Sequence, residues 1–312
     1  MKLKFWGVRG SIPTFMSSES LMGRIQSVIE RIKESDLKNQ DSKQAFIMSL
    51  PEYLTSCVGG NTSCVQLAVN EDEIFVFDAG TGLRDLGKNI SKSVKKIHIF
   101  LSHFHWDHIQ GIPFFDSFFN KDVEIHFYSP ELKMPEIIAN QMKGPYFPVE
   151  FNTLSAKIVF HNISTDNAFC VSKVYVKARK MTHPNTVYSY LFILPNGKRL
   201  IFATDIELGL SDFEYTDDRK DFFENADIMI ADCQYLPVEY HAKEGWGHSS
   251  YCYMVDFANH WHVKHLYMFH HEPMYDDKKL YEIRDNAREY SKKVLKSPLK
   301  IDLAVEHQEI DI

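Results

Sequence analysis

The sequence predicts an α/β fold, a four-layer αββα sandwich in which two mixed β-sheets pack face to face with helices outside. Two observations carry this prediction. Short apolar runs recur along the whole chain with turn signals between them, which is typical of strands. Amphipathic helical patterns are interspersed and become longer toward the C-terminus.

Ten apolar runs are the predicted strands. They lie at residues 3–8, 64–69, 73–77, 96–101, 123–128, 157–161, 171–177, 187–194, 199–203 and 227–230. Pro195-Asn196-Gly197 joins two of these runs, and Asn-Gly is a strong hairpin signal. Helical patterns cover residues 249–260 and 276–296, the second with alternating charges.

Residues 15–56 differ from the rest of what we take to be one domain spanning residues 1–312. Apolar residues recur there at helical spacing, a polar stretch follows, and a second apolar cluster closes the segment. We expect two short helices inserted between the first and second strands. Three interpretations stay open: a cover for the sheet, a lid over a site, or a contact that forms a homodimer.

Composition limits the class of protein. The 312 residues are 44% hydrophobic and 25% charged, which is ordinary for a soluble globular chain. The net charge of −7 does not favour a nucleic-acid partner, because such proteins present a basic face. Five cysteines without CxxC spacing, no signal-peptide pattern and no run of about 18 apolar residues predict a cytoplasmic protein without a membrane partner.

The densest chemical signal is His103-Phe104-His105-Trp106-Asp107-His108, directly after the apolar run at 97–101. His103 and His105 are two positions apart, so in extended backbone they project to the same side. Imidazole nitrogens with carboxylate oxygens are the ligand set of Zn²⁺, Mn²⁺ or Fe²⁺. A histidine-rich polar loop is the alternative, and this density of histidines disfavours it.

Further ligands must come from distant segments, and three strand ends offer them. His183, Asp205 and the pair His270-His271 each follow a strand-like run. Alone, each is a surface histidine or a turn carboxylate. Because all repeat the layout of the first motif, we expect them at one metal site.

These motifs resemble the signature of the metallo-β-lactamase superfamily. Asp78, in Phe77-Asp78-Ala79-Gly80, resembles the structural acid of its first motif. Within the superfamily, Trp6-Gly7-Val8-Arg9-Gly10-Ser11 and Gly59-Gly60-Asn61-Thr62 resemble the phosphodiesterase-like branch, which includes tRNA 3′-end processing endonucleases. The implied fold is the metallo-β-lactamase sandwich.

The resemblance also implies a division of ligands between two divalent ions, zinc first and manganese or iron as alternatives. One ion would be held by His103, His105 and His183. The other would be held by Asp107, His108 and His270, with His271 as the rival for the last position. Asp205 would bridge both ions.

The implied site would carry a net charge of about +1, from two divalent ions, two ligand aspartates and one bridging hydroxide. It should therefore attract a small anionic ester. The metal-bridging hydroxide would attack, and Asp107 counts as catalytic because it holds this site. His248, whose neighbours resemble the family's His-Ser-Thr motif, would protonate the leaving group, and Asp232 would orient it. Alternatively, Ser249 or Ser250 only caps a helix. Arg9 and Arg84 are phosphate contacts or surface ion pairs.

The expected function is therefore a dinuclear metal-dependent hydrolase of phosphodiesters, either cyclic nucleotides or other small phosphoesters. A tRNA-processing endonuclease is the nearest alternative. It is disfavoured by the negative charge and because residues 184–204 are too few for the long arm those enzymes often carry there. A non-catalytic metal-dependent binding module is the alternative from another class.

Overall fold

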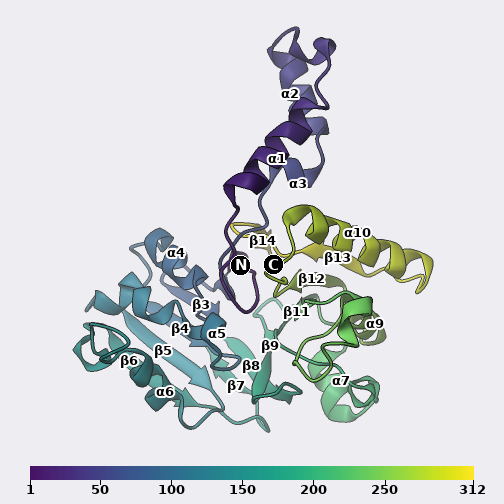
Figure 1. The fold of residues 1–312 in the computed structure, drawn as a ribbon. Helices are drawn as coiled ribbons and strands as arrows, with labels where there is room; N and C mark the ends of the chain where they lie inside the picture. Colours follow the sequence, from purple (N-terminus) through teal and green to yellow (C-terminus); the bar gives the residue numbers. More distant parts are fainter.

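The computed structural model describes residues 1–312 as two seven-stranded mixed sheets. The sheets face each other and helices cover both outer sides (Figure 1). The predicted αββα sandwich is confirmed. In each sheet one half is parallel and the other half antiparallel, so the carboxyl ends of the parallel strands meet at one edge.

Neighbouring strands are consecutive along the chain in both sheets, except that the C-terminal strand pairs with the N-terminal strand at the edge of the first sheet. From one edge to the other, the first sheet contains β14 (Glu309–Asp311), β1 (Lys2–Gly7), β2 (Cys64–Ala68), β3 (Glu73–Phe77), β4 (Lys96–Phe100), β5 (Glu124–Ser129) and β6 (Lys157–Asn162). The second contains β13 (Lys300–Leu303), β12 (His265–Phe269), β11 (Ile228–Asp232), β10 (Arg199–Ala203), β9 (Val187–Ile193), β8 (Val174–Met181) and β7 (Phe169–Val171).

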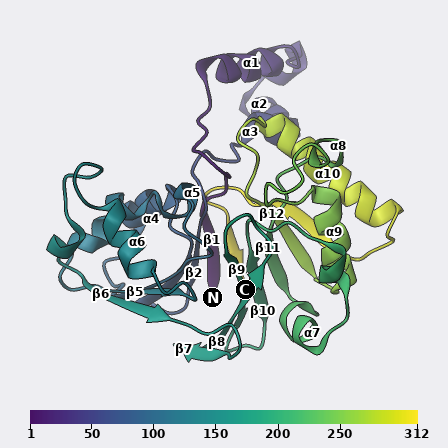
Figure 2. The same cartoon turned by 60° about the horizontal axis from the view of Figure 1, so that its bottom comes forward.

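The helices divide between the two outer faces (Figure 2). On the side of the first sheet lie α4 (Gly82–Asn89), α5 (Trp106–Ile109) and α6 (Met134–Gln141). On the side of the second lie α7 (Asp217–Phe223), α8 (Pro237–Tyr240), α9 (Tyr251–His260) and α10 (Asp277–Lys293). No helix combines the length and apolar character needed to cross a bilayer.

Aromatic packing joins the two sheets. Phe77 of β3 stacks on Phe192 of β9 with ring centroids 4.4 Å apart, and Phe100 of β4 meets the same Phe192 edge-on at 5.1 Å. All three side chains are fully buried. Large apolar side chains alternate along these strands, so each inner face fills the space between the sheets.

The turns explain where the strand predictions hold and where one is wrong. At the Asn-Gly hairpin between β9 and β10, Gly197 adopts φ +80° and its N–H donates to the Leu194 carbonyl at 2.8 Å, as predicted. The single strand predicted at 171–177 is in fact the β7–β8 hairpin. Ser172 and Lys173 turn the chain there with φ of 49° and 67°.

Residues 15–56 form helices α1 (Ser18–Ile29), α2 (Gln40–Ser49) and α3 (Glu52–Thr55), which we call the arm. Both views show the arm extending away from the sandwich (Figures 1 and 2). Neither α1 nor α2 buries a residue. At the base of the arm, Arg24 pairs with Asp277 of α10 and donates to the Ser56 carbonyl at 2.7 Å.

Candidate metal centre

The ends of β3, β10 and β12 turn three acidic or imidazole side chains toward one edge of the sandwich. Asp78, Asp205 and His270 follow these strands and adopt φ of 58°, 52° and 55°. This left-handed conformation costs a residue with a Cβ roughly 1–2 kcal/mol, and such strain concentrates at functional sites. The three predicted positions are therefore brought together by backbone geometry as well as by the sheet.

The first cluster consists of His103, His105, His183 and Asp205, whose potential ligand atoms all lie within 4.8 Å of one another. His103 Nε2 is 3.7 Å from Asp205 Oδ2. His183 Nε2 is 3.4 Å from His105 Nδ1. Loops after β4, β8 and β10 thus supply this group from both sheets.

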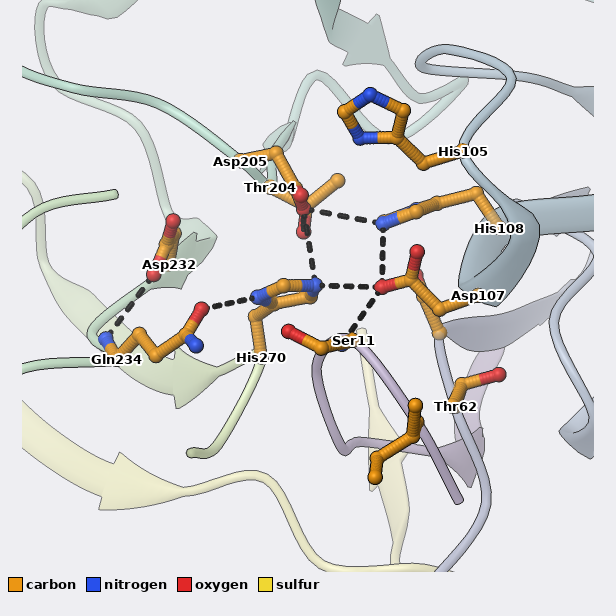
Figure 3. Close-up of polar contacts among 12 residues, drawn as sticks. Ser11, Thr62, His105, Asp107, His108, Thr204, Asp205, Asp232, Gln234 and His270 are labelled. Atoms are coloured by element: carbon orange, nitrogen blue, oxygen red, sulfur yellow. Dashed lines mark hydrogen bonds and ion pairs between the residues drawn. The ribbon is translucent and has the colours of Figure 1, made fainter. Parts of the chain in front are cut away.

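The second cluster consists of Asp107, His108, Asp205 and His270, all buried (Figure 3). His108 Nε2 lies 3.1 Å from Asp107 Oδ2 and 3.2 Å from Asp205 Oδ1. His270 Nε2 lies 3.1 Å from each of the same two oxygens. Asp205 belongs to both clusters, with Oδ2 facing the first and Oδ1 facing the second.

The buried imidazole nitrogens of the two clusters show whether these residues fit metal ions. His103 Nε2 is buried without a hydrogen-bond partner, and His108 Nε2 makes no hydrogen bond of proper geometry although it lies 3.1 Å from Asp107 and 3.2 Å from Asp205. An unsatisfied buried polar atom costs about 1–3 kcal/mol, so native structures rarely keep one without a reason. A divalent cation in each cluster would bind these atoms. The buried clusters are thus consistent with a dinuclear metal site, and nitrogen with carboxylate oxygen suits zinc, manganese or iron.

Protonation of the groups agrees with that donor set. Burial lowers the pKa of His103, His105 and His183, which leaves their imidazoles neutral. Burial alone would raise the pKa of Asp205. The nearby His108 and His270 rings have the larger, opposite effect and lower that pKa well below its usual range. Burial also disfavours a charged His108, yet Asp107, Asp205 and Asp78 raise its pKa, so a cation bound there displaces a proton.

Each imidazole is also held through its second nitrogen, which fixes its ring orientation. The partners are Ser102 Oγ for His103 (3.0 Å), the Asn185 amide for His105 (2.6 Å), Asp78 Oδ2 for His108 (2.6 Å), the Gly247 carbonyl for His183 (2.9 Å) and Gln234 Oε1 for His270 (3.0 Å). Asp78 additionally accepts from the Ser102 N–H at 2.8 Å. It therefore supports the clusters without belonging to either.

His248 lies beside both clusters. Its ring centroid is 5.5 Å from that of His183 and 5.1 Å from that of His270, and Nδ1 is 2.7 Å from Asp232 Oδ2. Burial lowers its pKa, but Asp232 outweighs burial and raises the pKa to about 9. The imidazole is thus protonated at neutral pH. The helix-capping interpretation also holds, because Ser250 Oγ accepts from the Tyr253 N–H.

The remaining predicted positions lie outside the clusters. Arg9 is buried and donates to the carbonyls of Gly59 (2.9 Å) and Tyr275 (2.8 Å), so it is neither a phosphate contact nor a surface ion pair. Arg84 is exposed and lies 3.7 Å from Asp85. His271 Nε2 donates to the Ala304 carbonyl, and burial lowers its pKa to about 3. His270 rather than His271 lies in the second cluster.

Two close contacts of glycine were not predicted. A Cβ on Gly10 would lie 2.5 Å from the His270 ring. A Cβ on Gly247, which has φ +93°, would lie 2.0 Å from His183 Nδ1. Gly10 stands in the motif Trp6–Ser11 and Gly247 directly precedes His248, so a glycine beside a predicted residue was the signal available in each case.

Glu207 is a further residue that the sequence did not predict. Its carboxylate accepts from the N–H groups of Gly245 (2.7 Å) and Gly247 (2.8 Å) and lies 3.4 Å from the Tyr240 hydroxyl. We call this the Glu207 clasp. It holds the loop that carries Gly247 and His248 against the clusters.

Comparison with known proteins places the chain in a family. Residues 74–271 match the model of the Beta-lactamase superfamily domain. The chain is similar to ribonuclease Z of Nitrosopumilus maritimus, with 24% identity over 269 residues, which cover 69% of this chain and 85% of that protein.

Two solved structures share the fold over nearly their whole lengths. A diphosphatase of the PhnP family has a TM-score of 0.64 at 14% identity, covering 100% of this chain and 97% of that one. The short form of human tRNase Z has a TM-score of 0.62 at 17% identity, covering 100% and 99%. The chain belongs to the metallo-β-lactamase superfamily.

Proposed function

We propose that this chain is a dinuclear, metal-dependent hydrolase of small phosphodiesters. The observation that carries the proposal is Asp205, whose two carboxylate oxygens face two separate groups of buried nitrogen and oxygen donors. A carboxylate shared in this way is suited to bridge two cations. Membership of a superfamily of metal-dependent hydrolases supports the same interpretation.

The ligand assignment follows the two clusters. His103, His105 and His183 would hold one ion, and Asp107, His108 and His270 would hold the other. When bound, the ions supply positive charge for the phosphoryl oxygens and activate water at neutral pH. The side chains that hold them are pre-positioned, because each imidazole has a fixed partner on its other nitrogen.

His248 would donate the proton that the leaving alkoxide needs. Asp232 holds Nδ1 at 2.7 Å, which leaves Nε2 as the free donor. The Asp232 carboxylate at 2.7 Å raises the pKa of His248, which favours the protonated ring that an acid needs. A buried aspartate that orients a histidine also stabilises its charged form, so the pair acts as one acid.

A tRNA-processing endonuclease is the second candidate, because the chain resembles ribonuclease Z of Nitrosopumilus maritimus. The segment between His183 and Asp205 contains only the β9–β10 hairpin, and the net charge is −7. Both facts favour a small ester over a polyanionic RNA. Affinity for tRNA that falls steeply with salt would favour the endonuclease instead.

The test combines bound metal with turnover of bis(p-nitrophenyl) phosphate. His103→Ala and Asp205→Ala should lose metal and activity together. His248→Ala should keep its metal and lose about 10²–10⁴-fold in rate on a cyclic nucleotide, whose leaving group is an alkoxide, and much less on bis(p-nitrophenyl) phosphate, whose leaving phenolate needs little protonation. His271→Gln, which keeps an N–H donor outside the clusters, is the matched control.

Three outcomes would contradict the proposal. Full metal content in His103→Ala or Asp205→Ala would reject the ligand assignment. Full activity of His248→Ala on the cyclic nucleotide would remove His248 from the mechanism. Metal without turnover across a broad panel of esters would identify a binding module rather than an enzyme.

A further inference from the structure

The four tryptophans of the chain divide sharply by exposure. Trp6 and Trp261 are 3% and 0% exposed, whereas Trp106 and Trp246 are 80% and 62% exposed. The buried pair also have aromatic partners, since Trp6 lies 5.4 Å from His307 and Trp261 lies 5.9 Å from Phe223. Neither exposed indole has such a partner within the chain.

Both exposed tryptophans are sequence neighbours of residues that form or contact the clusters. Trp106 stands between His105 and Asp107 at the start of α5, so it is bonded to a member of each cluster. Trp246 precedes Gly247, whose carbonyl accepts from His183 Nδ1 at 2.9 Å. The first indole belongs to the lobe of the first sheet and the second to the loop before α9, on the lobe of the second sheet.

Two further apolar side chains occupy equivalent positions. Ile12 is 59% exposed and follows Ser11, whose N–H donates to Asp107 Oδ2. Met274 is 85% exposed and lies four residues after His270. Four separate segments therefore each supply a group at the clusters and, close by in sequence, an exposed apolar side chain.

The exposure of the two indoles indicates a role in function, because an exposed side chain does not stabilise the hydrophobic core. An indole is a large apolar surface that proteins ordinarily bury, and exposed apolar side chains on the segments that carry a polar centre are candidates for contacts with a ligand. A flat indole face binds another flat ring best, by offset stacking. Phosphate-backbone binding instead relies on lysine and arginine.

We propose that Trp106 and Trp246 are specificity-determining residues that bind a planar aromatic group, nucleobase or aryl, attached to the phosphoester held at the clusters. This inference rests on the proposed function and narrows its substrate class. The ester group is recognised by charge at the centre, and the ring by the two indoles. Esters with a small alkyl group in place of the ring would lack the second contact.

The test measures binding to metal-loaded protein by calorimetry with two matched pairs of ligands. One pair is adenosine 5′-monophosphate and ribose 5-phosphate; the other is phenyl phosphate and methyl phosphate. A base stacked on an aromatic side chain gains enough for about tenfold tighter binding of the ring-bearing member. Preference in the first pair alone assigns a nucleobase, and preference in both assigns any planar ring.

Variants then locate the contact. Trp106→Ala and Trp246→Ala should each reduce the preference, the double variant should abolish it, and the Phe variants should keep most of it. Tyr175→Ala is the matched control, because Tyr175 is an exposed aromatic (57%) at the start of β8. It lies eight residues before His183, roughly 25 Å away along the strand. Unchanged metal content shows that each variant is folded at the site.

Acrylamide quenching supplies a readout independent of turnover. Saturation with adenosine 5′-monophosphate should protect tryptophan emission from acrylamide, whereas ribose 5-phosphate should not. Equal binding within both pairs, or a preference that survives the double alanine variant, would overturn the inference while the proposed function stands. Binding of none of the four monoesters would also overturn this inference, whereas the proposed function is tested separately by metal content and turnover.

Discussion

The Glu207 clasp offers a direct test of how the loop that carries His248 controls the metal centre. The carboxylate accepts from the N–H groups of Gly245 and Gly247 at 2.7 and 2.8 Å. Glu207→Gln keeps one oxygen acceptor but turns an NH₂ group toward the second N–H. One charge-assisted hydrogen bond is lost and two donors face each other.

The magnitude follows from what the clasp positions. A hydrogen bond to a charged group contributes about 1.5–3 kcal/mol, and for this half-buried carboxylate we take ~2 kcal/mol. Gly247 carries the carbonyl that accepts from His183 Nδ1 at 2.9 Å. A loop released by ~2 kcal/mol corresponds to about 30-fold weaker binding at His183. This agrees with the ~10–100-fold cost of losing the partner of a metal-binding histidine.

The assay is a titration of metal-free protein with zinc in competition with a chromophoric chelator. Glu207→Gln should weaken the ion of the first cluster about 30-fold and leave the other ion within about threefold. Gln234→Leu should do the reverse, because Gln234 Oε1 is the partner of His270 Nδ1 in the second cluster. Tyr240→Phe, which removes only the 3.4 Å contact to Glu207, is the control. Two unchanged affinities in Glu207→Gln would refute the reasoning about the clasp.

Two further predictions concern stability. Burial lowers the pKa of His98 to about 4, so only the unfolded chain takes up this proton as the pH falls from 6.5. The contribution of His98 to the unfolding free energy is therefore fully present above pH 6.5 and is lost, by about 3 kcal/mol, as the pH falls toward 4. Denaturant unfolding should show a fall that is about 3 kcal/mol smaller in His98→Gln than in the native protein, because the other buried histidines with lowered pKa contribute equally in both; equal falls would contradict this. Replacing residues 31–50 of the arm with a Gly-Ser linker should change the unfolding free energy by less than about 1 kcal/mol, because α1 and α2 bury no residue. Turnover of bis(p-nitrophenyl) phosphate should stay within about twofold, and a large loss would instead identify the arm as a lid.

Strands could be predicted where a long apolar run ends at a recognisable turn. The prediction failed where the run was short or the turn signal was weak. The hairpin at Asn196-Gly197 carries its own turn chemistry. The turn at Ser172-Lys173 does not, because neither residue is a usual choice for positive φ, so two strands were merged into one. Strands β13 and β14 have only four and three residues, too few for a period to appear.

The metal-centre residues could be anticipated because the sheet itself aligns them. In the parallel half of the second sheet, Ala203 is in register with Ala231, and Ala231 with Met268. Side chains just beyond these positions, such as Asp205 and His270, therefore emerge at the same edge. Apolar runs followed by ligand-type residues contain that information, since register follows from strand pairing.

The residues around the clusters, unlike the clusters themselves, could not be predicted from residue types. The clasp is made by backbone N–H groups and the contact to His183 by a backbone carbonyl, and every residue other than proline has both groups. No residue type indicates them, so in the sequence Glu207 looks like an ordinary turn carboxylate. Trp106 and Trp246 likewise look like core residues until their exposure is known. Ligand chemistry thus depends on residue types, whereas orientation and specificity depend on loop geometry, which is why the Glu207 and tryptophan variants test what the sequence alone could not predict.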